Sequence, residues 1–174
     1  GIDFNSIEFR NEQGESRVKS VYLPCVEGGA TSVIGGEELP GSSYATPEAI
    51  AALTTDCTTM SHGTHTTTTA AGSYKGNDCY GVATDADLVL CAMPEEELTD
   101  VNIANSIAYI FDYADRVGKP AVINMSLSSN CGPHDGTSML SQAMAAITGK
   151  GKVCVLSVGN DATLLTKVSK QFNV

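Results

Sequence analysis

Two histidines three positions apart are the side chains of this chain that are best suited to acid–base chemistry. His62 and His65 lie in the stretch 61–72, which reads SHGTHTTTTAAG. An imidazole titrates near neutral pH and can take up and return a proton, so His62 is a candidate general base. The four consecutive threonines have poor helix propensity, but the stretch lacks strand alternation and ends in small residues that suit close packing. We therefore predict a helix held by tertiary contacts, with His62 at its N-terminal end.

Metal binding is the alternative use of the two histidines. Together with Cys57 or Cys79, they would offer the nitrogen and sulfur ligands that zinc takes. Zinc-binding helices more often carry a glutamate directly after the first histidine, and this stretch has none. We favour the general base, and we predict no metal or cofactor; structural calcium stays open.

A second polar group stands where an apolar run ends. Asn160 follows residues 153–158 and Gly159, so its amide would lie at the carboxyl end of a strand, where open parallel sheets place their sites. An amide donor in that place can stabilise the negative oxygen of an acyl-transfer intermediate. The alternative is that Gly159 and Asn160 form only a turn.

The histidine stretch and four others resemble, in order along the chain, the motifs of the subtilase family of serine peptidases. Residues 1–3 match the end of the aspartate motif and residues 61–72 the histidine motif. Residues 81–86 match a segment that leads into a core strand, residues 122–127 the substrate-binding strand, and residues 157–160 the oxyanion segment. The nearest likeness is to bacterial subtilases with a long insertion between the aspartate and histidine motifs. Those proteins also carry GPHDGTS after the substrate-binding strand, as residues 132–138 do here.

The resemblance implies part of a serine endopeptidase with a Ser-His-Asp mechanism. His62 would be the general base, and Asn160 would belong to the oxyanion hole. Ser126, Leu127 and Ser128 would pair with the backbone of a peptide or protein substrate as an added strand. The resemblance also implies export to the periplasm, the cell surface or the medium.

Other residues of these motifs receive structural roles. Asp3 and His65 match the second aspartate and the second histidine of their motifs, which are structural positions. The letters GTSM at residues 136–139 imitate the nucleophile motif, but they precede Asn160, whereas the family's nucleophile follows the oxyanion residue. We therefore predict that Ser138 is not the nucleophile and that Thr137 caps a helix.

The family's orienting aspartate would lie two positions before Gly1, and its nucleophile would lie beyond the last residue. We expect the 174-residue chain alone to be inactive. In the family, the strand leading into the aspartate motif lies between the strands matched here by residues 88–93 and 121–127. We therefore expect the remainder of the protein, or a second copy, to complete the sheet, because unpaired buried backbone groups are costly.

Two other functions stay open. A non-catalytic subtilase-like domain could bind peptides or protein partners, and, less favoured, a metal-dependent hydrolase could use His62 and His65. Residues 95–97, all glutamates, follow a core strand where the family's second substrate-binding segment begins. They predict a preference for basic substrates, unless they form only a solvated loop.

The elements that must position these residues alternate between strands and helices. Strands are predicted at residues 18–23, 88–93, 121–127 and 153–158, and helices at 48–53, 100–117 and 138–147, besides the histidine helix. Asp100 is predicted to cap the second of these helices and Gly118 to end it, and Phe4, Ile7 and Phe9 are expected to pack the first residues onto the domain. This order indicates an α/β fold with a doubly wound, mainly parallel sheet, forming one partial catalytic domain over residues 1–174. Residues 25–47, rich in glycine, serine and threonine, are predicted to be a surface insertion.

Bulk properties exclude several kinds of partner. The net charge of −10 argues against nucleic acids and anionic membrane surfaces. No apolar run approaches the roughly 20 residues of a membrane span.

Of the six cysteines, Cys91 and Cys154 lie in apolar strands and are predicted to be buried thiols. The others could form a disulfide whose connectivity the spacing does not fix: Cys25, Cys57, Cys79 and Cys131.

Overall fold

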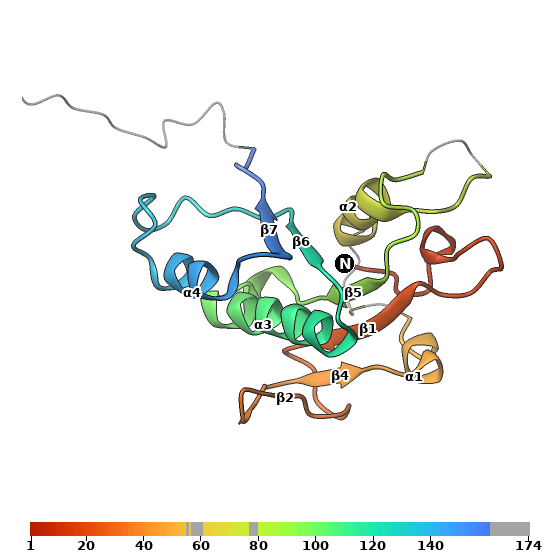
Figure 1. Ribbon diagram of the computed structural model, residues 1–174, viewed down its shortest axis with the longest axis horizontal. Helices are drawn as coiled ribbons and strands as arrows, with labels where there is room; N and C mark the ends of the chain where they lie inside the picture. Colours follow the sequence, from red (N-terminus) through yellow and green to blue (C-terminus); the bar gives the residue numbers. More distant parts are fainter. Residues whose placement is uncertain (55, 57–60, 77–79, 161–174) are drawn as a thin grey trace, which may run out of the picture.

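The computed structural model describes residues 1–54, 56, 61–76 and 80–160, and it shows an α/β fold built on parallel strands (Figure 1). One sheet has the order β4-β1-β5, in which β1 (Val18–Leu23) runs parallel to β5 (Leu88–Cys91) and antiparallel to the short edge strand β4 (Ser42–Tyr44). A second sheet pairs β6 (Ala121–Met125) with β7 (Lys152–Leu156) in parallel. The predicted fold class and the four main strands are confirmed.

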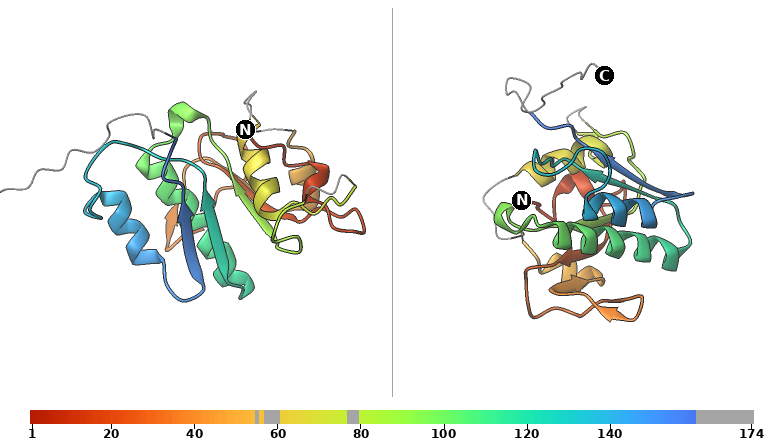
Figure 2. Two further views of the ribbon diagram at one scale, coloured as in Figure 1. Left: turned by 90° about the horizontal axis from the view of Figure 1, so that it is seen from above. Right: turned by 90° about the vertical axis from the view of Figure 1, so that its left-hand side faces the viewer.

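Helices cover both sides of these strands (Figures 1 and 2). After β5, the 3-10 turn η2 (Glu95–Glu97) leads into α3 (Asp100–Val117), which packs on both β5 and β6. The helix α4 (Met139–Ile147) joins β6 to β7 and packs beside α3. The histidine helix α2 (His62–Ala71) lies on the other side of β5.

Two helix caps differ from the prediction by one residue. The side chain of Thr99, not Asp100, caps α3 by accepting a hydrogen bond from Asn102 N (3.2 Å). Likewise Ser138, not Thr137, caps α4. Either neighbour of each pair is a good cap by type, so the backbone conformation decides which side chain reaches the open amides. At the other end of α3, Gly118 adopts a left-handed conformation (φ +67°) and ends the helix as predicted.

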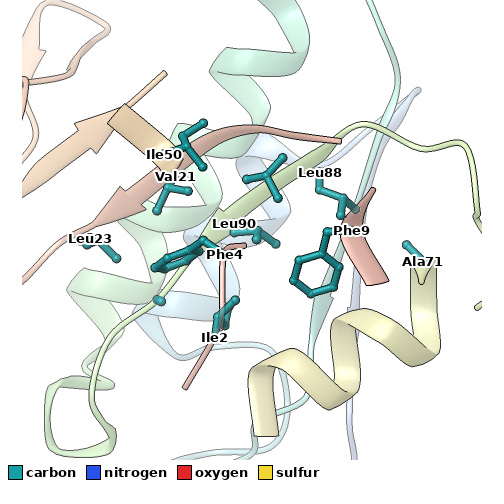
Figure 3. Close-up of a cluster of buried hydrophobic side chains, with 11 residues drawn as sticks. Ile2, Phe4, Phe9, Val21, Leu23, Ile50, Ala71, Leu88 and Leu90 are labelled. Carbon is teal, nitrogen blue, oxygen red and sulfur yellow. The ribbon is translucent and has the colours of Figure 1, made fainter. Parts of the chain in front are cut away.

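The hydrophobic core has two parts. The first packs Phe4 and Phe9 against β1, β5 and Ala71 of α2 (Figure 3), and both phenylalanines are fully buried. Phe9 ends the 3-10 turn η1 (Ile7–Phe9), whereas Ile7, which the sequence also placed against the core, is 54% exposed. The second part packs the apolar face of α3 on β6.

The segment predicted as a surface insertion contributes to the sheet. Its middle forms the hairpin of β2 (Val33–Ile34) and β3 (Glu37–Glu38), turned by Gly35 and Gly36, whose positive φ angles suit a two-residue hairpin loop. Near its end lies β4, with Ser42 buried, and the helix α1 (Pro47–Ala51) follows. Because β4 has only three residues, two of them serines, its sequence lacks the apolar alternation that would predict a strand.

Candidate functional site

A cavity of about 840 Å³ lies between the edges of β5 and β6, with α2 and α3 contributing to its walls. His62, the first residue of α2, lines it. Ser126 and Leu127, which follow β6, line it as well. The structure therefore brings the predicted base and two of the three predicted substrate-binding residues to one cavity.

The first turn of α2 is fixed by the beginning of the chain. Thr64 N donates to the carbonyl oxygen of Gly1 (3.1 Å), and Asp3 N donates to Thr64 Oγ1 (2.8 Å). A Cβ atom on Gly63 would lie 2.4 Å from Cγ1 of Ile2, so glycine permits this close approach. These contacts hold the backbone at His62, while its side chain is exposed.

The last turn of α2 is held by a buried arginine. The guanidinium of Arg17 donates to the carbonyl oxygen of Ala71, to Ser73 Oγ (3.1 Å) and to the carbonyl oxygen of Ala86 (2.8 Å). Arg17 is 5% exposed, and burial lowers its pKa below the usual value, partly offset by Asp85 and Asp87. The helix that carries His62 is thus fixed at both ends.

The ends of β6 and β7 lie side by side. Ser157 N donates to the carbonyl oxygen of Met125 (3.2 Å), and Ser157 Oγ donates to that of Leu127 (3.0 Å). Gly159, with φ +87°, lies against Ser128, whose Oγ would be 2.7 Å from an added Cβ. Ser128, the third predicted substrate-binding residue, therefore neighbours the predicted oxyanion segment at residues 157–160. Asn160 itself is exposed and lies outside the cavity lining.

The other residues singled out in the sequence lie as follows. The carboxylate of Asp3 accepts a hydrogen bond from Asn5 N (3.0 Å), which forms a local turn. His65 is exposed on α2. Ser138 Oγ accepts from Ser141 N (3.1 Å) and donates to Ser141 Oγ (2.8 Å), so the hydroxyl serves the start of α4.

Sequence reasoning missed Asp56. This residue is buried, and its Oδ2 lies 3.8 Å from the amino nitrogen of Gly1, beside the first turn of α2. It lies between the threonine-rich residues 54–55 and the histidine motif, where no pattern distinguishes a buried carboxylate from a loop residue.

The cysteines and acidic residues offer no metal site within the described residues, where no three histidine, cysteine, aspartate or glutamate side chains come together. Cys57 and Cys79, the predicted alternative ligands, lie outside the described part of the chain. Cys25, Cys91, Cys131 and Cys154 are free thiols. Desolvation raises the pKa of the Cys91 thiol to about 12. The disulfide expected among the loop cysteines stays a prediction.

Comparison with known proteins gives the family. The family model described as the subtilase family matches residues 54–173. Among solved structures, the Clostridium perfringens CspB protease aligns with a TM-score of 0.68 and 24% identity, over 90% of this chain and 34% of that one. The chain thus spans about a third of that protein's length. No curated protein matched, and none of the described helices is long and apolar enough to cross a membrane. Since the family model covers more than half of the sequence, the chain belongs to the subtilase family.

Proposed function

We propose that this chain is the histidine- and asparagine-bearing part of a serine endopeptidase. The observation that carries the proposal is the placement of His62 on a cavity that also reaches Ser126 and Leu127, at the carboxyl end of β6. The carboxyl ends of parallel strands are where α/β sheets place their sites.

In this mechanism His62 takes the proton from a serine hydroxyl as its oxygen attacks the scissile carbonyl carbon. The imidazolium then returns that proton to the departing amine. The serine and the aspartate that orients His62 are supplied by residues outside the 174. Export, as in other subtilases, is part of the proposal.

Asn160 donates its amide N–H to the oxygen that becomes negative in the tetrahedral intermediate. Such a donor contributes about 3–4 kcal/mol of transition-state stabilisation in subtilisin, another member of the family, from which the magnitude is taken. Support here comes from the neighbouring Ser128 and Gly159, because they bring the ends of β6 and β7 together. The substrate backbone pairs along Ser126, Leu127 and Ser128 as an added strand.

The test compares two histidines of one helix in the complete natural protein. His62→Ala should lower kcat/KM for a peptide substrate by about a thousandfold or more, because it removes proton transfer. His65→Ala, the matched control, should stay within about tenfold of the unaltered enzyme. Full activity in the His62 variant would refute the proposal. If neither the unaltered protein nor any variant cleaves peptides, the non-catalytic binding domain is favoured. Loss of peptidase activity on treatment with a zinc chelator would favour the metal-dependent hydrolase.

A further inference from the structure

The segments that follow β6 and β7 touch each other just beyond the ends of the two strands. Ser157 N donates to Met125 O (3.2 Å), which continues the parallel ladder, and Ser157 Oγ donates to Leu127 O (3.0 Å). In a longer ladder, Leu127 O would be the acceptor for Gly159 N. The Ser157 hydroxyl therefore holds the two segments together at the place where the backbone ladder ends.

The side chain of Ser128 occupies the space beside Gly159. A Cβ atom added to Gly159 would lie 2.7 Å from Ser128 Oγ and 3.3 Å from Ser128 Cβ. Both distances are shorter than an ordinary contact between carbon atoms, which is about 3.5–4 Å. Rotation about χ1 of Ser128 would move its Oγ, but its Cβ would stay in place. Ser128 thus fills the side of Gly159 on which another side chain could otherwise lie.

This contact lies next to the place that the proposed function gives to the substrate. The substrate backbone pairs along residues 126–128, and Asn160 holds the oxygen of the scissile carbonyl at about 3 Å. The substrate residue that carries this carbonyl is called the acyl-side residue here. Its Cβ is separated from the carbonyl carbon by the Cα alone, so its side chain begins close to Asn160 and beside Gly159. The atoms of Ser128 are therefore the first that this side chain meets.

We propose that Ser128 restricts the enzyme to peptide bonds that follow a small residue, namely alanine, serine or glycine, and excludes leucine and phenylalanine. The inference rests on the proposed peptidase function and adds the class of substrate. A methyl group can lie beside Ser128, whereas a longer side chain needs the volume that the Cβ and Oγ of Ser128 fill next to Gly159. Forcing extra atoms into filled space costs free energy unless the protein moves.

Movement of the two segments is opposed by contacts of the residues around Ser128. Spreading them would break the hydrogen bond from Ser157 Oγ to Leu127 O, and it would pull on Leu127, which packs against the core between α3 and β6. The next residue, Ser129, has a different role, because its Oγ accepts a hydrogen bond from Cys131 N (3.1 Å) within the loop. An alternative use of the Ser128 hydroxyl is to bind a polar acyl-side residue, which would favour glutamine over alanine.

The test measures cleavage by the complete natural protein of peptides that differ only in the acyl-side residue. We expect kcat/KM to be about a hundredfold or more higher for alanine than for phenylalanine. Ser128→Gly should lower this ratio about tenfold or more, chiefly by raising kcat/KM for phenylalanine, because it removes the obstructing atoms. Ser129→Gly is the matched control, and it should leave the ratio unchanged even where a looser loop lowers both values.

A binding measurement separates this inference from the peptidase function. In the complete protein with His62→Ala, a peptide that ends in alanine should bind about tenfold or more tightly than one that ends in phenylalanine, as followed by fluorescence anisotropy. The inference is overturned, with the peptidase function intact, if alanine and phenylalanine peptides are cleaved equally well, if Ser128→Gly leaves the ratio unchanged, or if glutamine is preferred to alanine. Absence of cleavage with the expected order of binding would refute the peptidase function and uphold the role of Ser128. Absence of both would overturn both.

Discussion

Removing the buried guanidinium of Arg17 should loosen the helix that carries His62. Arg17 immediately precedes β1, and its side chain reaches across to the last turn of α2 and to the loop before β5. Methionine supplies an unbranched, apolar side chain in place of the arginine. The replacement leaves the carbonyl oxygens of Ala71 and Ala86 without this donor. The expected result is a loss of stability together with faster local opening at the end of α2.

The magnitude follows from these contacts. Two hydrogen bonds from a charged donor to carbonyl oxygens contribute about 1.5–3 kcal/mol each, so the gross loss is about 3–6 kcal/mol. Part of this is offset, because the variant no longer buries a charge; the lowered pKa of Arg17 shows that burial disfavours the charged form. We therefore expect the free energy of unfolding to fall by about 2–4 kcal/mol.

The assay is equilibrium urea unfolding followed by far-ultraviolet circular dichroism, with the free energy extrapolated to water. Arg10→Met is the matched control. Its guanidinium donates to the carbonyl oxygen of Gly14 (2.9 Å) in an exposed turn, so the loss of this side-chain hydrogen bond should cost less than about 1 kcal/mol. A fall below 1 kcal/mol for Arg17→Met, equal to the control, would refute the claim that this side chain holds α2 in place.

Three further predictions address the site and its surroundings. In the complete enzyme, Asn160→Ala should lower kcat about a hundredfold or more with little change in KM, because its hydrogen bond strengthens only in the transition state; a change mainly in KM would assign it to substrate binding. Replacing all three glutamates of η2 by glutamine should weaken a preference for basic substrates, most clearly at low salt, and a cleavage profile without such a preference would remove this prediction. Cys131, exposed, should react with a thiol reagent much faster than Cys91, which is partly buried and whose pKa is raised to about 12 by desolvation; equal rates at neutral pH would contradict this difference.

Strong periodic patterns predicted much of the fold. The apolar runs gave β1, β5, β6 and β7, and the apolar face of α3 with Gly118 after it gave that helix almost to the residue. The histidine helix was predicted against its own propensities, and the contacts of its first turn with residues 1–3 show what overrides them.

Features that depend on long-range contacts were less predictable. The edge strand β4 and the buried Arg17, just before β1, have no local signal in the sequence, because their partners lie far along the chain. The separation of β5 from β6 was expected only through the family resemblance. In the candidate site, the structure brings His62, Ser126 and Leu127 to one cavity. The role of Asn160 stays a prediction.

The most direct test of the central claim is to map the serine that a fluorophosphonate probe labels in the complete natural protein. If His62 is the base for a nucleophile outside this chain, mass spectrometry should find the label on a serine beyond the 174 residues. Labelling should be lost in His62→Ala and kept in Ser138→Ala. A label on Ser138, or labelling that survives removal of His62, would contradict the account.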